Sequence, residues 1–171
     1  GNENSAFGFQ ALHANTTGEG NTGLGRKTLF TNTTGGQNVA VGQGALLANT
    51  TASENVAVGY DAMVSNTTGA DNVAVGYHAL DANTTGSNNT SIGYDSLSGN
   101  TTASNNTALG YEALKASTTA SENVAIGAQS MLSTTTGGDN TALGQVSLKS
   151  NTTGVSNVAI GRKALQDATT A

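Results

Sequence analysis

The chain has 171 residues, of which 36% are hydrophobic and 4% aromatic, so a conventional globular core of large apolar side chains is hard to build. Disordered chains are usually rich in charge and proline, whereas here 10% of residues are charged and proline is absent. The net charge of −5, with six Lys and Arg, offers no basic surface for nucleic acid, and no apolar run is long enough to insert into a membrane.

The chain is organised as a 17-residue repeat. With Asn as position 1, copies begin at Asn4, Asn21, Asn38 and every 17 residues on to Asn157, ten in all without an insertion. The consensus is N-V-A-V-G-Y-x-A-L-x-x-N-T-T-G-x-x, and positions below refer to it. Residues 1–171 are therefore expected to form a single repeat array. Because no capping coil is evident at either end, we expect an excerpt of a longer fibre, or a unit that stacks end to end.

The first predicted element of each copy is a strand over positions 2–4, where β-branched residues alternate, as in Val39 and Val41. These two side chains are expected to point inward. The glycine at position 5 ends the strand at a turn, a second short strand follows around A-L, and N-T-T-G forms a second corner. The residues expected to stack as ladders along the molecule are Asn38, Asn55, Asn72, Gly42, Gly59, Gly76, Thr50, Thr51, Thr67 and Thr68.

The pattern predicts an all-β fold, a parallel β-solenoid or β-roll of about ten coils. Stacking at the strand spacing gives a rod of roughly 48 Å. Only positions 4 and 9, with Val at position 2 in half the copies, offer large apolar side chains, so the core of a lone chain is thin.

Position 3 carries a small residue in every copy, although a residue that points outward into solvent has no need to be small. We therefore predict that this face packs against another copy of the chain. The alternative is that Ala is simply neutral on an exposed strand. The residues of this predicted oligomer face are Ala40, Ala57, Ala74, Ala125 and Ala159.

The strand motif resembles the YadA-like head repeats of trimeric autotransporter adhesins, which read S-V-A-I-G. The segments that resemble it most are 123–127 and 157–161, both N-V-A-I-G. The variant N-T-A-L-G-Y-x-A-L, from Asn106 to Leu114, is similar to repeats of tail-fibre proteins that end in a self-cleaving chaperone domain. The resemblance implies a left-handed β-roll, three chains per head and binding to host surfaces or matrix, although the unit here is a few residues longer.

Several side chains suggest further functions. Position 6 is Tyr in four consecutive copies, which predicts either a strip that stacks on glycans of a target surface or an aromatic ladder packed on itself. Acids at positions 7 and 17 could hold a cation or simply be solvated. The residues of the predicted glycan-binding or receptor-binding strip are Tyr60, Tyr77, Tyr94 and Tyr111.

The Thr pairs raise the alternative of an ice-binding solenoid, although adjacent Thr residues point in opposite directions along an extended chain. Asn-Thr-Thr also matches the N-glycosylation sequon, and corner formation explains the same pattern without sugar. The Asn-Thr-Thr sites begin at Asn15, Asn32, Asn49, Asn66, Asn83, Asn100 and Asn151.

No nucleophile–base–acid set occurs, and His13 and His78 lie at different repeat positions, so neither an enzyme, a cofactor nor a metal site is predicted. The sequence predicts a structural segment of an extracellular fibre or adhesin, a tail-fibre or surface-filament shaft or head, located at a cell surface or on a virion. Its expected partners are itself, as a trimer or an end-to-end filament, and cell-surface glycans or matrix.

Overall fold

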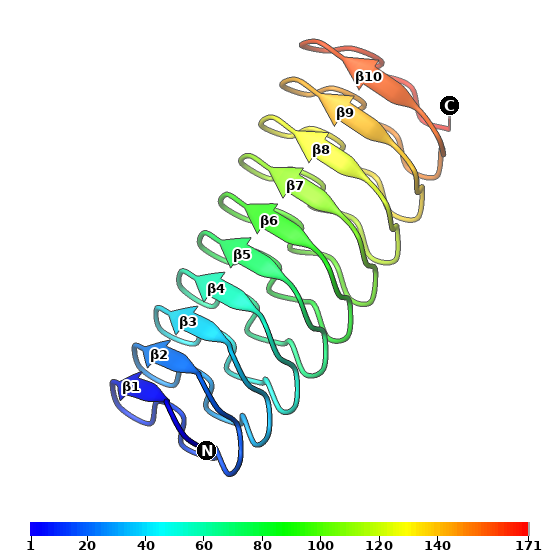
Figure 1. Cartoon of the computed structure of the whole chain (residues 1–171). Coiled ribbons are helices and arrows are strands. Elements are labelled where there is room, and N and C mark those ends of the chain that lie inside the picture. Colours follow the sequence, from blue (N-terminus) through cyan, green and yellow to red (C-terminus); the bar gives the residue numbers. More distant parts are fainter. Residues whose placement is uncertain (171) are drawn as a thin grey trace.

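The computed structural model describes residues 1–170 and forms a straight parallel β-solenoid, with the chain ends at opposite ends of the rod (Figure 1). Each repeat copy contributes one coil with one three-residue strand, always at positions 2–4. The strands are β1 (Ser5–Phe7), β2 (Thr22–Leu24), β3 (Val39–Val41), β4 (Val56–Val58), β5 (Val73–Val75), β6 (Thr90–Ile92), β7 (Thr107–Leu109), β8 (Val124–Ile126), β9 (Thr141–Leu143) and β10 (Val158–Ile160).

The ten strands form one parallel sheet in sequence order. Each residue pairs with its equivalent in the next copy, as Val39 with Val56 and Ala40 with Ala57. Backbone bonds between coils continue outside the strands, for example from the N–H of Leu46 to the carbonyl of Ala62 at 3.1 Å. The predicted all-β solenoid with 17-residue coils is therefore confirmed.

The prediction of which strand residues face inward was wrong. Position 3 lies inside the coil and positions 2 and 4 point outward: Ala40 is fully buried, while Val39 and Val41 are only half-buried. The residues of the predicted oligomer face, now part of the core, are Ala40, Ala57, Ala74, Ala125 and Ala159, between 0 and 2% exposed. They are small because the coil interior is narrow, and they cannot form an outer contact.

The core of most coils is filled by small residues, mainly Ala, at positions 3 and 8, by Leu or Met at position 9, and by Asn at positions 1 and 12. In the coil that starts at Asn38, these residues are Asn38, Ala40, Ala45, Leu46 and Asn49, all fully buried. Small side chains let the two walls of the coil approach, so one large residue per coil suffices to fill it.

The second strand predicted around positions 8 and 9 is also wrong, because that segment is a series of turns. Position 9 has a left-handed backbone, with φ of 52° at Leu46 and 53° at Met63. A leucine in this conformation costs of order 1–2 kcal/mol, and it persists because the turn places the side chain in the core. Packing therefore overrides local preference here.

The turn at position 5 requires glycine for two reasons. Gly59 has φ of 143°, and a Cβ atom on it would overlap the carbonyl oxygen of Gly76 in the next coil. The same geometry recurs at Gly42 and Gly76. Stacking therefore forces glycine at this corner in every interior coil.

Candidate functional site

The outer face of the sheet is an apolar strip that runs the length of the rod. It consists of positions 2 and 4, where only Ser, Thr, Val, Leu, Ile and Phe occur. Leu24, Leu109 and Leu143 at position 4 are 42 to 47% exposed. Monomeric proteins seldom expose so long an apolar strip.

The two rows of this strip compensate each other. Leu occurs at position 4 only in coils with Thr at position 2, as in the pair Thr107 and Leu109. Val occurs at position 4 only beside another Val, as in Val56 and Val58. The coils with Leu or Val at position 4 thus combine the more polar residue in one row with the larger apolar residue in the other, whereas Ile at position 4 occurs with either Thr or Val.

The two internal Asn residues of each coil form the amide ladders of the rod. At position 1, Asn38 Nδ2 donates to Asn21 Oδ1 at 3.1 Å, and the backbone N–H of Asn38 donates to the same oxygen at 3.0 Å. At position 12, Asn49 Nδ2 donates to Asn32 Oδ1 at 2.8 Å and to the carbonyl of Ala52 at 3.0 Å. The first ladder matches the expectation for Asn38, Asn55 and Asn72, and the sequence reasoning missed the second.

The four Tyr residues form a continuous ladder of stacked rings. Ring centroids of Tyr60 and Tyr77, Tyr77 and Tyr94, and Tyr94 and Tyr111 lie 5.2, 5.3 and 5.6 Å apart, and the interplanar angles are 5–17°. The ring of His78 also stacks on Tyr77 at 4.1 Å. The rings therefore pack on one another, which agrees with the predicted aromatic ladder.

This stacking limits what the Tyr strip can bind. Each ring is still 42–50% exposed, but the face of an inner ring is covered by its neighbour. A sugar that stacks on an aromatic ring needs a free ring face. The ladder therefore presents ring edges and hydroxyl groups to solvent.

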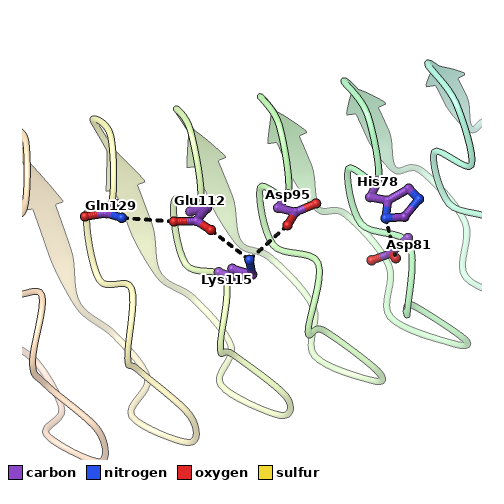
Figure 2. A network of polar contacts seen from close by, with 6 residues as sticks. All are labelled: His78, Asp81, Asp95, Glu112, Lys115 and Gln129. Atoms are coloured by element: carbon purple, nitrogen blue, oxygen red, sulfur yellow. Dashed lines mark hydrogen bonds and ion pairs between the residues drawn. The ribbon is translucent and has the colours of Figure 1, made fainter.

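A row of polar contacts runs beside the ladder, shown in Figure 2. Lys115 Nζ donates to Asp95 Oδ2 at 2.9 Å and to Glu112 Oε1 at 2.8 Å, and Gln129 Nε2 donates to Glu112 Oε2 at 2.9 Å. The row links three successive coils. Glu112 and Lys115 are three residues apart in one copy, and Asp95 occupies the position of Glu112 in the preceding copy. The repeat register therefore already places these three charges together, but the sequence analysis did not predict the network.

The contacts shift the titration of this row. Hydrogen bonds from Lys115 and Gln129 lower the pKa of Glu112, and hydrogen bonds to Glu112 and Asp95 raise the pKa of Lys115. The negative charge of Asp95 raises the pKa of Tyr94. Glu112 and Lys115 thus stay charged while the Tyr94 phenol stays protonated at neutral pH.

A shallow hollow of about 600 Å³ lies next to this row. It is lined by residues of successive coils, among them Ala82, Gly99 and Ala116, together with Asp81 and Lys115. Burial raises the pKa of Asp81 although His78, with Nδ1 3.7 Å from Asp81 Oδ2, opposes this. The hollow is open, and no buried polar group points into it to define a ligand.

The two Thr rows differ in function. The hydroxyl groups at position 13 form hydrogen bonds between coils. Thr50 Oγ1 donates to the carbonyl of Thr67 at 3.1 Å, and Thr67 Oγ1 donates to the carbonyl of Thr84 at 2.9 Å. At position 14, Thr51 and Thr68 are exposed. The rod therefore presents a single free Thr row.

The aspartates at positions 7 and 17 have a backbone explanation. Both positions have positive φ, 50° at Asp61 and 59° at Asp71. Asp and Asn adopt this left-handed conformation more readily than most residues. Within residues 1–170 no group of three or more His, Cys, Asp or Glu side chains is placed to hold a metal ion.

In the part of the chain that the structure describes, no helix is long and apolar enough to cross a membrane. The sequence matches no family model and no curated protein, and the structure matches no solved structure.

Proposed function

We propose that this chain is a structural segment of an extracellular fibre or adhesin, in which solenoid rods associate side by side through the outer sheet face. The observation that carries the proposal is the apolar strip at positions 2 and 4, which continues over all ten coils. The resemblance to YadA-like head repeats and tail-fibre repeats supports a cell-surface or virion location and three chains per rod. The proposed role is mechanical and adhesive rather than catalytic.

A second copy of the chain fits this strip better than an unrelated partner. The strip is straight, uncharged and repeats at the coil spacing, so a parallel copy in the same register presents an equally long complementary surface. The pairs Thr107 with Leu109 and Val56 with Val58 keep the apolar content of the Leu and Val coils comparable. Such balance is expected where side chains pack against a continuous surface.

Light scattering on the whole chain tests the proposal. We expect the mass of three chains, and we expect Leu24→Lys, Leu109→Lys and Leu143→Lys together to give a folded monomer, because three charges would be desolvated at the contact. These leucines are already more than 40% exposed, so the single-chain fold should tolerate the change.

The matched control places the same charges in the same coils on the exposed Thr row, as Thr34→Lys, Thr119→Lys and Thr153→Lys. This variant should keep the wild-type mass. A wild-type chain that stays monomeric at high concentration, or a control that dissociates equally, would refute association through the sheet face.

The ice-binding alternative is favoured by one observation, the exposed Thr row at position 14. Because the hydroxyls of position 13 are engaged between coils, only one row is free, and a plane of two regular rows is missing. Thermal hysteresis measured in solution decides this alternative directly, and we expect none.

A further inference from the structure

The Tyr ladder contains every tyrosine of the chain, which makes it chemically distinct from the rest of the rod. The sequence has four Tyr, no Trp and no Cys. The two methionines, Met63 and Met131, are fully buried in the core. The phenols of the ladder are therefore the accessible side chains that a one-electron oxidant removes electrons from most readily.

The geometry brings neighbouring phenols together in a fixed arrangement. Tyr60 and Tyr77 have ring centroids 5.2 Å apart with an interplanar angle of 10°, and both rings are more than 40% exposed. The coils that hold them are locked by backbone hydrogen bonds, such as that from the N–H of Gly76 to the carbonyl of Val58 at 2.8 Å. Holding two reactants side by side raises their effective concentration far above that in solution.

We propose that Tyr60, Tyr77, Tyr94 and Tyr111 form an oxidative cross-linking site, at which hydrogen peroxide activated by a haem peroxidase joins rings of adjacent coils as dityrosine. Each of two neighbouring phenols loses one electron and one proton to give a phenoxyl radical. The radicals couple through their ortho carbons, and the ring hydrogens at the new bond move to the two oxygens. One hydrogen peroxide accepts both electrons and both protons and leaves as two waters.

The product is a covalent staple between residues 17 apart in the sequence. It joins one coil to the next on the surface of the rod, outside the core and without loss of any backbone bond. Closing a loop of this length restricts the unfolded chain, as a disulfide does. The cross-link thus hardens the rod in an oxidising environment, a property independent of whether rods associate through the sheet face.

The test uses two double variants that retain the same number of tyrosines. Tyr60→Phe with Tyr77→Phe leaves Tyr94 and Tyr111 in adjacent coils, whereas Tyr77→Phe with Tyr111→Phe leaves Tyr60 and Tyr94 two coils apart. Phe keeps the ring stack and removes the phenol, so both variants should fold, which circular dichroism and thermal melting check.

Each chain is treated with horseradish peroxidase and hydrogen peroxide, then digested and analysed by mass spectrometry and dityrosine fluorescence. We expect a cross-linked peptide pair lacking two hydrogens, from a single chain, in the wild type and the adjacent-pair variant, with at least a tenfold lower yield in the separated-pair variant. The cross-linked wild type should unfold at a higher denaturant concentration.

Equal yields from the two variants, or cross-links found only between different chains on a denaturing gel, would overturn the proposal. So would oxidation that consumes the tyrosines without forming the biaryl bond.

Discussion

Asparagine at position 12 shows how much one residue contributes to the rod. Its ladder is interrupted where Ser117 and Thr134 replace Asn in two successive coils. Asn100 Oδ1 and Thr134 Oγ1 are the two buried side-chain polar atoms among the described residues that have no hydrogen-bond partner. Both lie at this interruption, because the side chain that would continue the ladder is too short to reach.

Restoring the ladder should stabilise the protein. In the double variant Ser117→Asn and Thr134→Asn, the new amide at 117 donates to Asn100 Oδ1 and the one at 134 continues the row to Asn151. Each restored bond contributes about 1 kcal/mol, so the free energy of unfolding should rise by about 1–3 kcal/mol. Chemical denaturation measures it.

Asn66→Ser serves as the control, since it creates a second interruption in an intact part of the ladder and should lower the stability. An unchanged denaturation midpoint in the restored variant would mean that water already forms hydrogen bonds with Asn100 Oδ1 and Thr134 Oγ1. The ladder would then contribute less to stability than its geometry indicates.

The Asn residues of the position-12 ladder are also the acceptor residues of the Asn-Thr-Thr sequons. Asn49 and Asn83 are fully buried, and Asn49 Nδ2 donates to Asn32 Oδ1, so no glycan fits at these amides in the folded coil. We expect that glycosylation of a position-12 Asn and folding exclude each other. After secretion from a glycosylating eukaryotic host, the protease-resistant fraction should carry no glycan at these asparagines, which peptide mapping by mass spectrometry checks; glycan on the exposed sequons at Asn88 and Asn105 is counted separately.

A control removes the sequons without touching the core. Position 14 is exposed, so changes of the type Thr51→Val eliminate the sequon at the surface. They should increase the secreted folded yield. A folded, protease-resistant chain that carries glycan on a position-12 Asn would show that the ladder is dispensable.

At the scale of the strand and its facing turn, positions 3 and 8 determine the width of the coil. Most coils have Ala or a similar small residue at both, as in Ala40 and Ala45. One coil instead combines Gly23 with the larger Thr28, and a Cβ atom at position 23 would lie 2.8 Å from Thr28 Oγ1. The two walls therefore compensate each other in size.

A double-mutant cycle tests this contact. Gly23→Ala alone should destabilise the protein by about 1–3 kcal/mol through overpacking. Adding Thr28→Ala recreates the Ala–Ala pair of other coils and should recover most of that loss, which makes the coupling energy favourable. Urea denaturation of the wild type, both single variants and the double variant provides the four values; additive effects would mean that the walls do not touch.

The same contact explains why strand orientation was predicted wrongly. An alternating V-A-V segment has two faces, and a one-residue shift exchanges them. The larger residue is normally placed inside, but here the interior is narrow and a second copy is proposed to cover the outer residues. The paired change of Gly23 and Thr28 carried the correct signal, since residues that face each other across a narrow interior must compensate in size.

For the molecule as a whole, the sequence was sufficient to predict the coil length, the parallel stack and the Asn ladder at position 1, because an exact repeat forces equivalent residues to stack. It was insufficient for the turn around Leu46, whose positive φ contradicts local preference. It left open whether the ring faces of the Tyr strip are covered, because this depends on side-chain direction at a corner.

A rod held by contacts between neighbouring coils should tolerate loss of a whole coil and nothing smaller. Deletion of 55–71 removes 17 residues and brings β3 against β5 in the same register as before. We expect a folded chain with a cooperative transition, and a denaturant m-value lower by roughly a tenth, because the surface exposed on unfolding falls in that proportion.

Deletion of 55–70 removes one residue fewer and leaves an extra residue at the junction. Every side chain on one side must then shift to the opposite face, or the stack must break there. Gly42, which stacks on Gly59 in the full chain, would no longer meet a glycine, because Gly76 is displaced by one residue. We expect loss of cooperative unfolding and increased protease cleavage at the junction. If the two deletions behave alike, coil-to-coil register does not determine the stability of the rod.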